Sequence, residues 1–348
     1  MQALRTDTES MRCRGMIGTG GIGAGSFFLL SGDHTLGREE SRGGRFLDRR
    51  DYCKLHIISH YVQTLLGPGF ETIPLGRVGD DDVGTKLLSE MEEAGMNMKY
   101  VRRSPGEQTL YSFCFVYRDG SGGNLTTDDS ASAKVEAAFV REAEPEFARL
   151  AGKGVALAAP EVPLKAREAV LELGTKHGFL RAASFTSEEM ASAVGSTVLR
   201  RVDLLGINAD EAAAAAGGLL MGGEGALEAA EVAAEKLHRA KPDMVITITA
   251  GKSGSWCWDE SSRYHMPIFE GRVESTAGAG DAHLAGMIVG MAAGLTAREA
   301  HQLAALVAGL SVTSPHTINK ETGRDSLRGF AQACGAKLSD SVRNLLEE

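Results

Sequence analysis

Residues 275–281 of this 348-residue chain combine a carboxylate with a run of small side chains. They read STAGAGD and directly precede the apolar segment 282–295. Small residues let the backbone N–H groups of a helix N-terminus converge on an anion, and the helix dipole favours negative charge there. Asp281 beside such amides could take a proton from a hydroxyl while a phosphoryl group is transferred. A helix cap is the alternative role for Asp281.

Two other segments are similar to nucleotide-binding motifs but lack the required context. Residues 18–23, GTGGIG, match the GxGxxG dinucleotide fingerprint, which needs a helix starting at its third glycine. The next segment, 24–32, is a poor helix candidate, so a nicotinamide-dependent oxidoreductase is a distant alternative. Residues 251–253, GKS, match part of a Walker loop, but Ile246 stands where that loop requires glycine.

Cys53, His56 and His60 are spaced to share one face of a predicted helix, 52–66. These residue types can ligate a metal, but no clear fourth ligand accompanies them. We therefore favour a polar helix face that lines a pocket, with a metal site as the alternative.

The charge and the apolar segments exclude several classes of partner. The formal net charge is −9, so no global positive field attracts nucleic acid or an anionic membrane surface. The longest nearly apolar stretch, 284–295, is too short to cross a bilayer, which needs about 20 residues. The N-terminal residues lack the apolar core of a secretory signal, and five scattered cysteines fit reduced thiols. We expect a cytoplasmic protein with neither a nucleic-acid nor a membrane partner.

The order of predicted elements indicates an α/β fold. Residues 16–30 are predicted to form a buried strand with a bend, and 31–51 a charged, loop-like segment. From residue 131 onward, helical segments and short apolar strands alternate, which implies a parallel sheet covered on both faces. Nothing in the composition suggests a linker between independent domains, so we predict one α/β domain with a smaller β-rich appendage.

The chain resembles a known family, the ribokinase-like or PfkB carbohydrate kinases. Their signature D-T-x-G-A-G-D-x-F-x-A-G is similar to STAGAGDAHLAG at 275–286. Three further segments follow the family's order: 74–101, the N-x-x-E-like 208–211, and 245–259. The likeness spans roughly residues 15–318.

The resemblance implies a three-layer α/β/α sandwich with a mostly parallel central sheet and a small β-rich lid. It implies a single kinase domain over 1–318, with lid elements drawn from about 31–51 and 96–130. Residues 319–348 are predicted to be a polar C-terminal tail.

The activity that the resemblance implies is transfer of the ATP γ-phosphate to a hydroxyl of a sugar or sugar-like small molecule. Asp281 would be the general base, with the amides of Ala279 and Gly280 holding developing charge and Gly278 shaping the turn. Asn208 and Glu211 would organise Mg²⁺, mainly through water, while also fitting a plain helix start. Residues 303–312 would wall the adenine pocket. The other predicted nucleotide contacts are Thr249, Gly251, Gly254 and Thr276.

The acceptor region departs from the family pattern. Gly25, or a neighbour, stands where many members carry a sugar-binding aspartate, and 51–56 replaces the usual Gly-Gly-x-x-x-Asn stretch. Ser275 stands where the signature begins with Asp, so a monovalent cation stays unassigned. The charged segment is expected to be a solvated loop; the sharper hypothesis is that its arginines close over an acidic or phosphorylated acceptor. The substrate candidates are Gly25, Arg38, Arg42, Arg45 and His56.

Two alternatives stay open within this resemblance. The acceptor could be a nucleoside, or the protein could be a catalytically weak nucleotide- or metabolite-binding regulator that has kept the fold. Retention of Asp281, Asn208 and Glu211 favours an active enzyme. By analogy with the family, a homodimer formed through the lid is also an open alternative.

Overall fold

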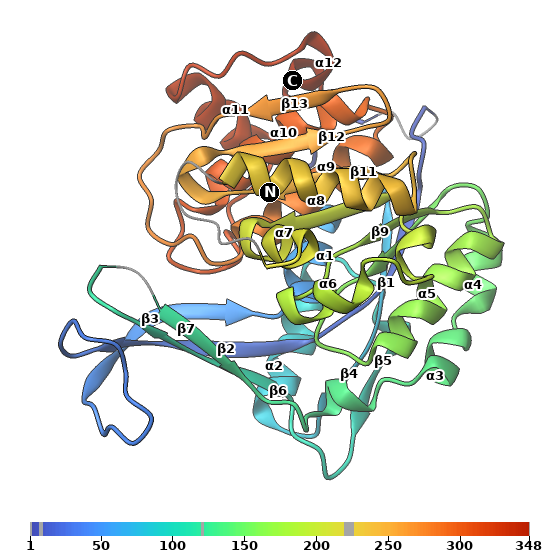
Figure 1. Cartoon of the computed structure of the whole chain (residues 1–348). Helices are drawn as coiled ribbons and strands as arrows, with labels where there is room; N and C mark the ends of the chain where they lie inside the picture. Colours follow the sequence, from blue (N-terminus) through green and yellow to red (C-terminus); the bar gives the residue numbers. More distant parts are fainter. Residues whose placement is uncertain (1, 7–9, 120–121, 219–225, 348) are drawn as a thin grey trace.

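A nine-stranded sheet forms the centre of the computed structural model, which describes residues 2–6, 10–119, 122–218 and 226–347. The strand order is β13-β12-β11-β10-β9-β8-β1-β4-β5 (Figure 1). All neighbours are parallel except at one edge, where β12 pairs antiparallel with both β11 and β13. The predicted mostly parallel sheet is confirmed. Its strands are β1 (Gly15–Thr19), β4 (Glu71–Gly79), β5 (Val101–Ser104), β8 (Gly154–Ala158), β9 (Leu180–Ala183), β10 (Leu204–Asn208), β11 (Val245–Thr249), β12 (Ser255–Trp258) and β13 (Arg263–Met266).

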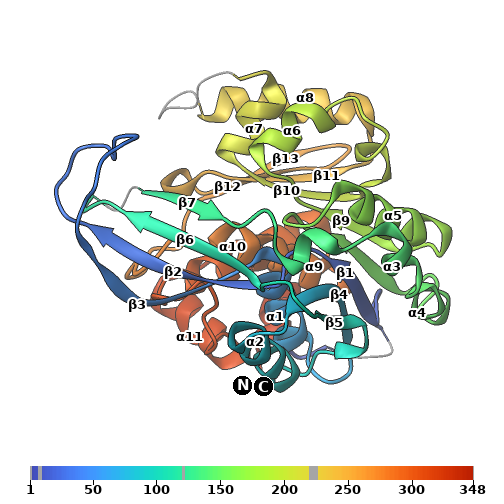
Figure 2. The same ribbon diagram turned by 90° about the horizontal axis from the view of Figure 1, so that it is seen from below.

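Helices cover both faces of this sheet, which gives the predicted three layers (Figure 2). One face carries α1 (Lys54–Leu66), α2 (Asp82–Glu93), α9 (Ala279–Ala292), α10 (Ala297–Ser311), α11 (Arg324–Ala333) and α12 (Asp340–Leu346). The other face carries α3 (Ala137–Arg141), α4 (Glu144–Arg149), α5 (Leu164–Lys176), α6 (Ser187–Ala193), α7 (Ala209–Ala216) and α8 (Ala226–Ala240). Within the described ranges, no helix combines the length and apolar character needed to cross a membrane.

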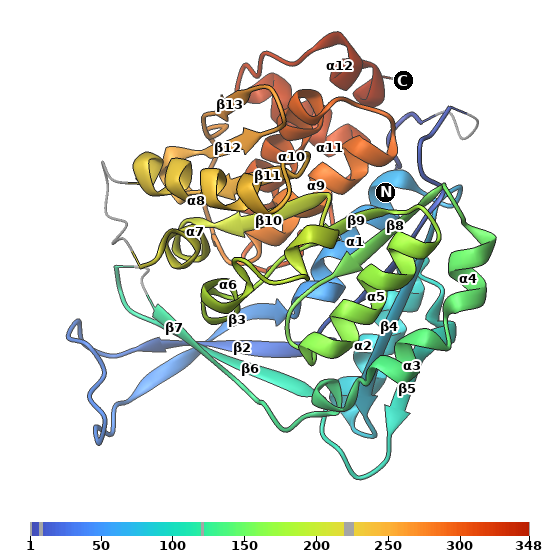
Figure 3. The ribbon, with the colours of Figure 1, turned by 45° about the vertical axis from the view of Figure 1, so that its right-hand side comes forward.

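A separate four-stranded sheet forms the lid, with strand order β3-β2-β6-β7. Figure 3 shows these strands extending away from the main sheet. They are β2 (Gly23–Leu30), β3 (Gly44–Tyr52), β6 (Leu110–Val116) and β7 (Gly122–Thr126). Residues 120 and 121, inside the second predicted lid segment, lie outside the described residues.

The lid corrects two sequence predictions. The segment 31–51 is not all loop, because Gly44–Tyr52 pairs with β2 and adds a strand to the lid. The predicted single strand over 16–30 is two strands, and the second belongs to the lid sheet. Since β2 begins at Gly23, no helix starts at the third glycine of the GxGxxG match. The segment therefore lacks the helix that a dinucleotide-binding fingerprint requires, as the sequence predicted.

The C-terminal segment is not the polar tail that the sequence suggested. Its two helices, α11 and α12, pack against α10 with their apolar faces. Leu327 and Val342 are fully buried there. The prediction failed because the buried residues are few and spaced at helical intervals, so a mostly polar composition concealed an amphipathic pattern.

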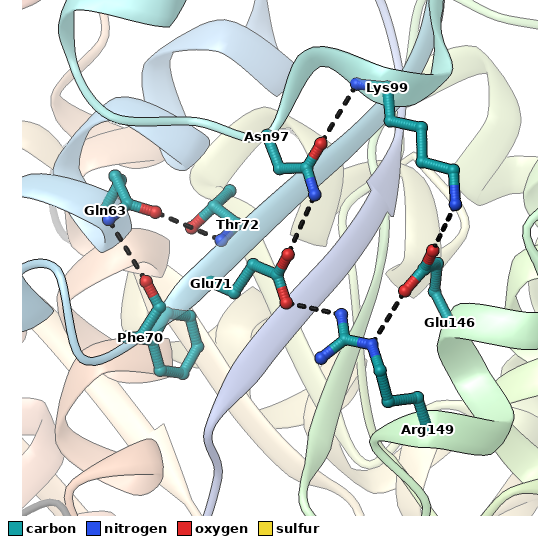
Figure 4. A network of polar contacts seen from close by, with 8 residues as sticks. All are labelled: Gln63, Phe70, Glu71, Thr72, Asn97, Lys99, Glu146 and Arg149. Carbon is teal, nitrogen blue, oxygen red and sulfur yellow. Dashed lines mark hydrogen bonds and ion pairs between the residues drawn. The ribbon is translucent and has the colours of Figure 1, made fainter.

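A polar network joins β4 to α1, to α4 and to the segment just before β5 (Figure 4). Gln63 donates through Nε2 to Phe70 O at 3.1 Å and accepts the Thr72 amide at 3.0 Å. Farther along, carboxylates and cations alternate in the order Glu71, Arg149, Glu146 and Lys99. None of these residues lines the two cavities described below, so we assign the network to structural support of β4.

Helices α9 and α10 approach so closely that a glycine is required between them. A Cβ atom on Gly286 would lie 2.5 Å from Ala304 Cα. We therefore expect Gly286→Ala to lower the free energy of unfolding by about 1–3 kcal/mol, since overpacking must push the helices apart. Denaturant titration measures this. Gly329→Ala in α11 is the control: nothing lies within 4 Å of its added Cβ, so it should be neutral or slightly stabilising. Equal effects at both positions would contradict the packing argument.

Candidate active site

A cavity of about 970 Å³ lies at the carboxyl ends of β10 and β11. This edge is where open parallel sheets generally bind ligands. The cavity is lined by every residue that the sequence analysis assigned to nucleotide, magnesium or charge stabilisation: Asn208, Glu211, Thr249, Gly251, Gly254, Thr276, Gly278, Ala279, Gly280 and Asp281. Ala305, Ala308, Gly309 and Val312, within the predicted adenine wall, line it as well.

Helix α9 begins at this cavity with the turn that the small-residue motif predicted. Gly278 has a φ of 78°, and a Cβ there would lie 2.7 Å from Thr317 O, so only glycine fits. The Ala279 amide donates to Thr276 O at 3.3 Å. The next amides, of Gly280 and Asp281, lie in the first turn, where helix geometry supplies no intrahelical acceptor. These amides are therefore the best placed to receive an anion.

The side chain of Asp281 is 15% exposed and lies next to a lysine that the sequence analysis did not single out. Burial raises the pKa of the Asp281 carboxyl, and the nearby Lys54 ammonium opposes that shift. Lys54 Nζ lies 3.9 Å from Asp281 Oδ1 and 3.9 Å from Glu211 Oε1. One cation therefore bridges the proposed base and the proposed metal-organising carboxylate.

Asn208 and Glu211 form a capping box at the start of α7. Asn208 Oδ1 accepts the Glu211 amide at 2.9 Å, and Glu211 Oε2 accepts the Asn208 amide at 2.8 Å. The plain helix-start role is thus present. Glu211 also reaches the cavity wall, and its Oε1 faces Lys54. Burial raises the pKa of Glu211, with Lys54 again opposing the shift. Both roles that the sequence allowed are compatible in one geometry.

A second, smaller cavity of about 290 Å³ lies on the other side of Asp281, at the base of the lid. Lys54, Gly278 and Asp281 line both cavities, so the two spaces meet at the proposed base. Glu161 lines the small cavity and has a φ of 73°, the one positive φ among described non-glycine residues. Such a conformation is costly and marks functional sites.

The Glu161 carboxylate is held by the neighbouring backbone. The Lys54 amide, at the N-terminus of α1, donates to Glu161 Oε2 at 3.1 Å. Gly21 has no side chain, and a Cβ there would lie 2.4 Å from the same oxygen. Burial raises the pKa of Glu161 to about 7, while Lys54 lowers it.

The predicted substrate residues do not gather here. Gly25, Arg38, Arg42, Arg45 and His56 line neither cavity. Arg42 pairs with Glu40 at 2.6 Å and donates to His34 O, so it is held within its own loop. His56 is fully buried, with its ring 4.8 Å from that of Tyr52. In the described part of the chain, no group of three or more His, Cys, Asp and Glu side chains could hold a metal, so the Cys53–His56–His60 alternative gains no support.

Comparison with known proteins decides the family. Residues 62–323 match the profile of the pfkB family carbohydrate kinases. The chain belongs to this family. The resemblance stated from the sequence is thereby confirmed. A stretch of 104 residues is 30% identical to the ribokinase of Schizosaccharomyces pombe, covering 30% of this chain and 31% of that protein.

Solved structures with the same fold cover nearly all of this pfkB family member. A ribokinase from Cryptococcus neoformans var. grubii serotype A, in complex with ADP, matches with a TM-score of 0.75 and 17% identity, covering 92% of this chain and 99% of that one. A Burkholderia thailandensis nucleoside kinase, in complex with inosine, matches with a TM-score of 0.70 and 16% identity, covering 92% and 99%. The predicted ribokinase-like fold is confirmed.

In this pfkB family member, sequence reasoning did not single out three charged residues of the small cavity, Asp51, Lys54 and Glu161. Glu161 had a usable signal, because it follows the predicted strand 155–159 and so lies at the ligand-binding edge of a parallel sheet. Asp51 had none, because it ends a charged run that is typical of a solvated loop. Lys54 lies in the predicted helix 52–66, where only Cys53, His56 and His60 were singled out.

Proposed function

We propose that the protein is an ATP-dependent kinase that phosphorylates a hydroxyl group of a small sugar-like molecule. The observation that carries the proposal is the position of Asp281 between two cavities. The larger cavity suits a nucleotide, and the smaller one suits an acceptor below the usual size of drug-like ligands. A shared carboxylate at their junction can act on a hydroxyl from one cavity and a phosphoryl group from the other.

In the proposed reaction, a carboxylate oxygen of Asp281 accepts the proton of the acceptor hydroxyl as its oxygen attacks the γ-phosphorus. The N-terminal amides of α9 stabilise the charge that develops on the phosphoryl oxygens. Lys54 supplies a positive charge at the same junction. The lid lies over the acceptor side, where its strands exclude water and so limit ATP hydrolysis.

Asn208 and Glu211 fit a magnesium ion that is held mostly through water. The pair offers oxygen atoms at the wall of the nucleotide cavity, and both are already fixed by the capping box. Mg²⁺ keeps several waters and is often bound by only one or two carboxylates plus substrate phosphates. When bound, the ion would offset negative charge on the phosphates.

We expect Glu211→Gln to weaken Mg²⁺ binding, raising the half-saturating Mg²⁺ concentration for activity by roughly tenfold or more. A glutamine oxygen still accepts the Asn208 amide, so the helix cap survives while the charge is lost. Initial rates across a Mg²⁺ titration measure this. Glu299→Gln is a matched control, because Glu299 occupies the same capping-box position in α10 but lines neither cavity. A normal Mg²⁺ titration for Glu211→Gln would refute the assigned role.

The general test is acceptor-dependent ADP release by the purified protein. A panel of sugars, polyols and nucleosides should contain at least one compound that stimulates ADP release well above the rate without acceptor. The same panel separates the alternatives. Turnover confined to nucleosides would support the nucleoside kinase alternative. The Burkholderia nucleoside kinase in complex with inosine, which has the same fold, is the observation that favours this alternative. Nucleotide binding without turnover on any acceptor would support the binding-protein alternative.

A further inference from the structure

The small cavity beside Asp281 has an unusual charge balance. Among the described residues that line it, three are carboxylates, Asp51, Glu161 and Asp281, one is a cation, Lys54, and none is an arginine. Lys54 is already engaged, since its ammonium lies 3.9 Å from both Asp281 and Glu211. The cavity is therefore negatively charged on the side away from the nucleotide.

Asp51 is built into the wall of this cavity by three lid strands. It stands opposite Gly25 of β2 in the strand register, and Gly25 stands opposite Ser112 of β6. A Cβ on Gly25 would lie 2.3 Å from Ser112 Oγ and 2.9 Å from Asp51 Cβ. The glycine thus makes room for the two polar side chains to meet, which explains its place in the sequence without any contact of its own to a substrate.

The Asp51 carboxylate has neutral donors and no cation. Ser112 Oγ donates to Asp51 Oδ2, and Cys114 Sγ donates to the same oxygen at 3.4 Å. Within the described ranges, no lysine, arginine or histidine lies at ion-pair distance from Asp51. Burial raises the pKa of Asp51, and Asp51 in turn raises the pKa values of Glu161 and Asp281. The repulsion among these carboxylates is only partly relieved by Lys54.

Charged groups taken out of water are normally paired, and a carboxylate can only accept hydrogen bonds. We propose that Asp51 binds a positively charged amine of the acceptor, and that the acceptor is a small polyhydroxy compound carrying such an amine. Glu161 lines the same cavity and would place a second carboxylate near that amine. This inference rests on the proposed kinase function, because it treats the small cavity as the acceptor site.

The same charges disfavour an acidic or phosphorylated acceptor. A carboxylate or phosphate in this cavity would face Asp51 and Glu161 with Lys54 already paired. The arginines that suggested such an acceptor from the sequence line neither cavity. The structure thus reverses the sign of the acceptor charge that the sequence hypothesis favoured.

The experiment measures acceptor binding by calorimetry in the presence of Mg²⁺ and a non-hydrolysable ATP analogue. The probes are hexoses and pentoses, their aminodeoxy analogues with the amine at each carbon in turn, and the matching uronates. At least one amine should bind wild type ten or more times tighter than its neutral parent, and no uronate should bind tighter than its parent. Asp51→Asn should bring the best amine-to-parent ratio close to one while leaving binding of the neutral parent within about threefold. Asparagine keeps an oxygen that can accept from Ser112.

Asp48→Asn is the matched control, because Asp48 lies on the same strand but is exposed and lines neither cavity. It should keep the wild-type ratio. The proposal is overturned if no amine binds better than its parent, or if Asp51→Asn keeps the preference. ADP release is recorded separately. Turnover that depends on Asp281 but shows no preference for an amine would support the proposed kinase function and refute this inference. Binding of an amine without turnover would support amine recognition by Asp51 and refute the kinase function.

Discussion

Asp281→Asn is expected to lower kcat by about 10²–10⁴-fold, the usual contribution of a positioned general base. Asparagine cannot take the proton from the acceptor hydroxyl, yet it has nearly the same size. The turn at Gly278 and the amides at the start of α9 stay in place, so nucleotide binding should change by less than about threefold. Steady-state kinetics with the best acceptor, together with calorimetric titration of ATP, separate the two effects.

The control for this variant is Asp82→Asn, which removes an exposed acid from the first turn of α2 without touching either cavity. It should leave turnover unchanged. Near-wild-type turnover of Asp281→Asn would exclude Asp281 as the base. A large loss of nucleotide affinity would instead show that the carboxylate acts mainly through the structure of the helix start.

Lys54→Met is expected to lower kcat/KM by about 10²–10³-fold and to move the acid limb of its pH profile to higher pH. The sign follows from the charges. Lys54 lowers the pKa of Asp281, so removing the ammonium raises that pKa further above its usual range. The base must be deprotonated to act, so a higher pH is then needed for the same activity. Initial rates from about pH 5 to pH 9 measure the shift.

The same substitution should make stability fall more steeply with rising pH. Without Lys54, the carboxylates of Glu211, Asp281 and Glu161 hold their protons to higher pH in the folded state than in the unfolded state. A group with a raised pKa favours the folded state at low pH and loses that contribution as the pH rises through the folded-state pKa. Thermal unfolding at several pH values tests this.

Lys54→Arg separates charge from placement. Arginine keeps the positive charge, so the acid limb should stay close to that of wild type even if its bulkier head group lowers turnover. An unchanged acid limb in Lys54→Met would mean that the ammonium does not act on Asp281, and the 3.9 Å approach would then be incidental.

The nucleotide side of the site could be predicted from the sequence because local segments build it. Residues 275–281 form a single turn and helix start, and Asn208 and Glu211 form a single capping box. The conformation of each depends mainly on neighbouring residues, through glycine freedom and capping. Both segments also lie at the carboxyl ends of the strands of one parallel sheet, which the alternating pattern of strands and helices had already implied.

The acceptor side could not be predicted, because it is assembled from residues far apart in the chain. Asp51 meets Ser112 only because β2 lies between β3 and β6, a register that no local pattern specifies. Glu161 reaches the cavity through a loop after β8 and is held by the amide of Lys54. The C-terminal helices were missed for a different reason: their few apolar residues, which pack against α10, are spaced at helical intervals within a mostly polar segment.

The sequence by itself determined the kind of fold, the family and the residues around the nucleotide cavity, the proposed base among them, since those depend on short-range rules of turn, cap and periodicity. Only the tertiary structure decided which charges line the acceptor cavity. Strand pairing placed Asp51 there and left the arginines of the same charged run outside, and the resulting excess of carboxylates sets what the cavity can bind.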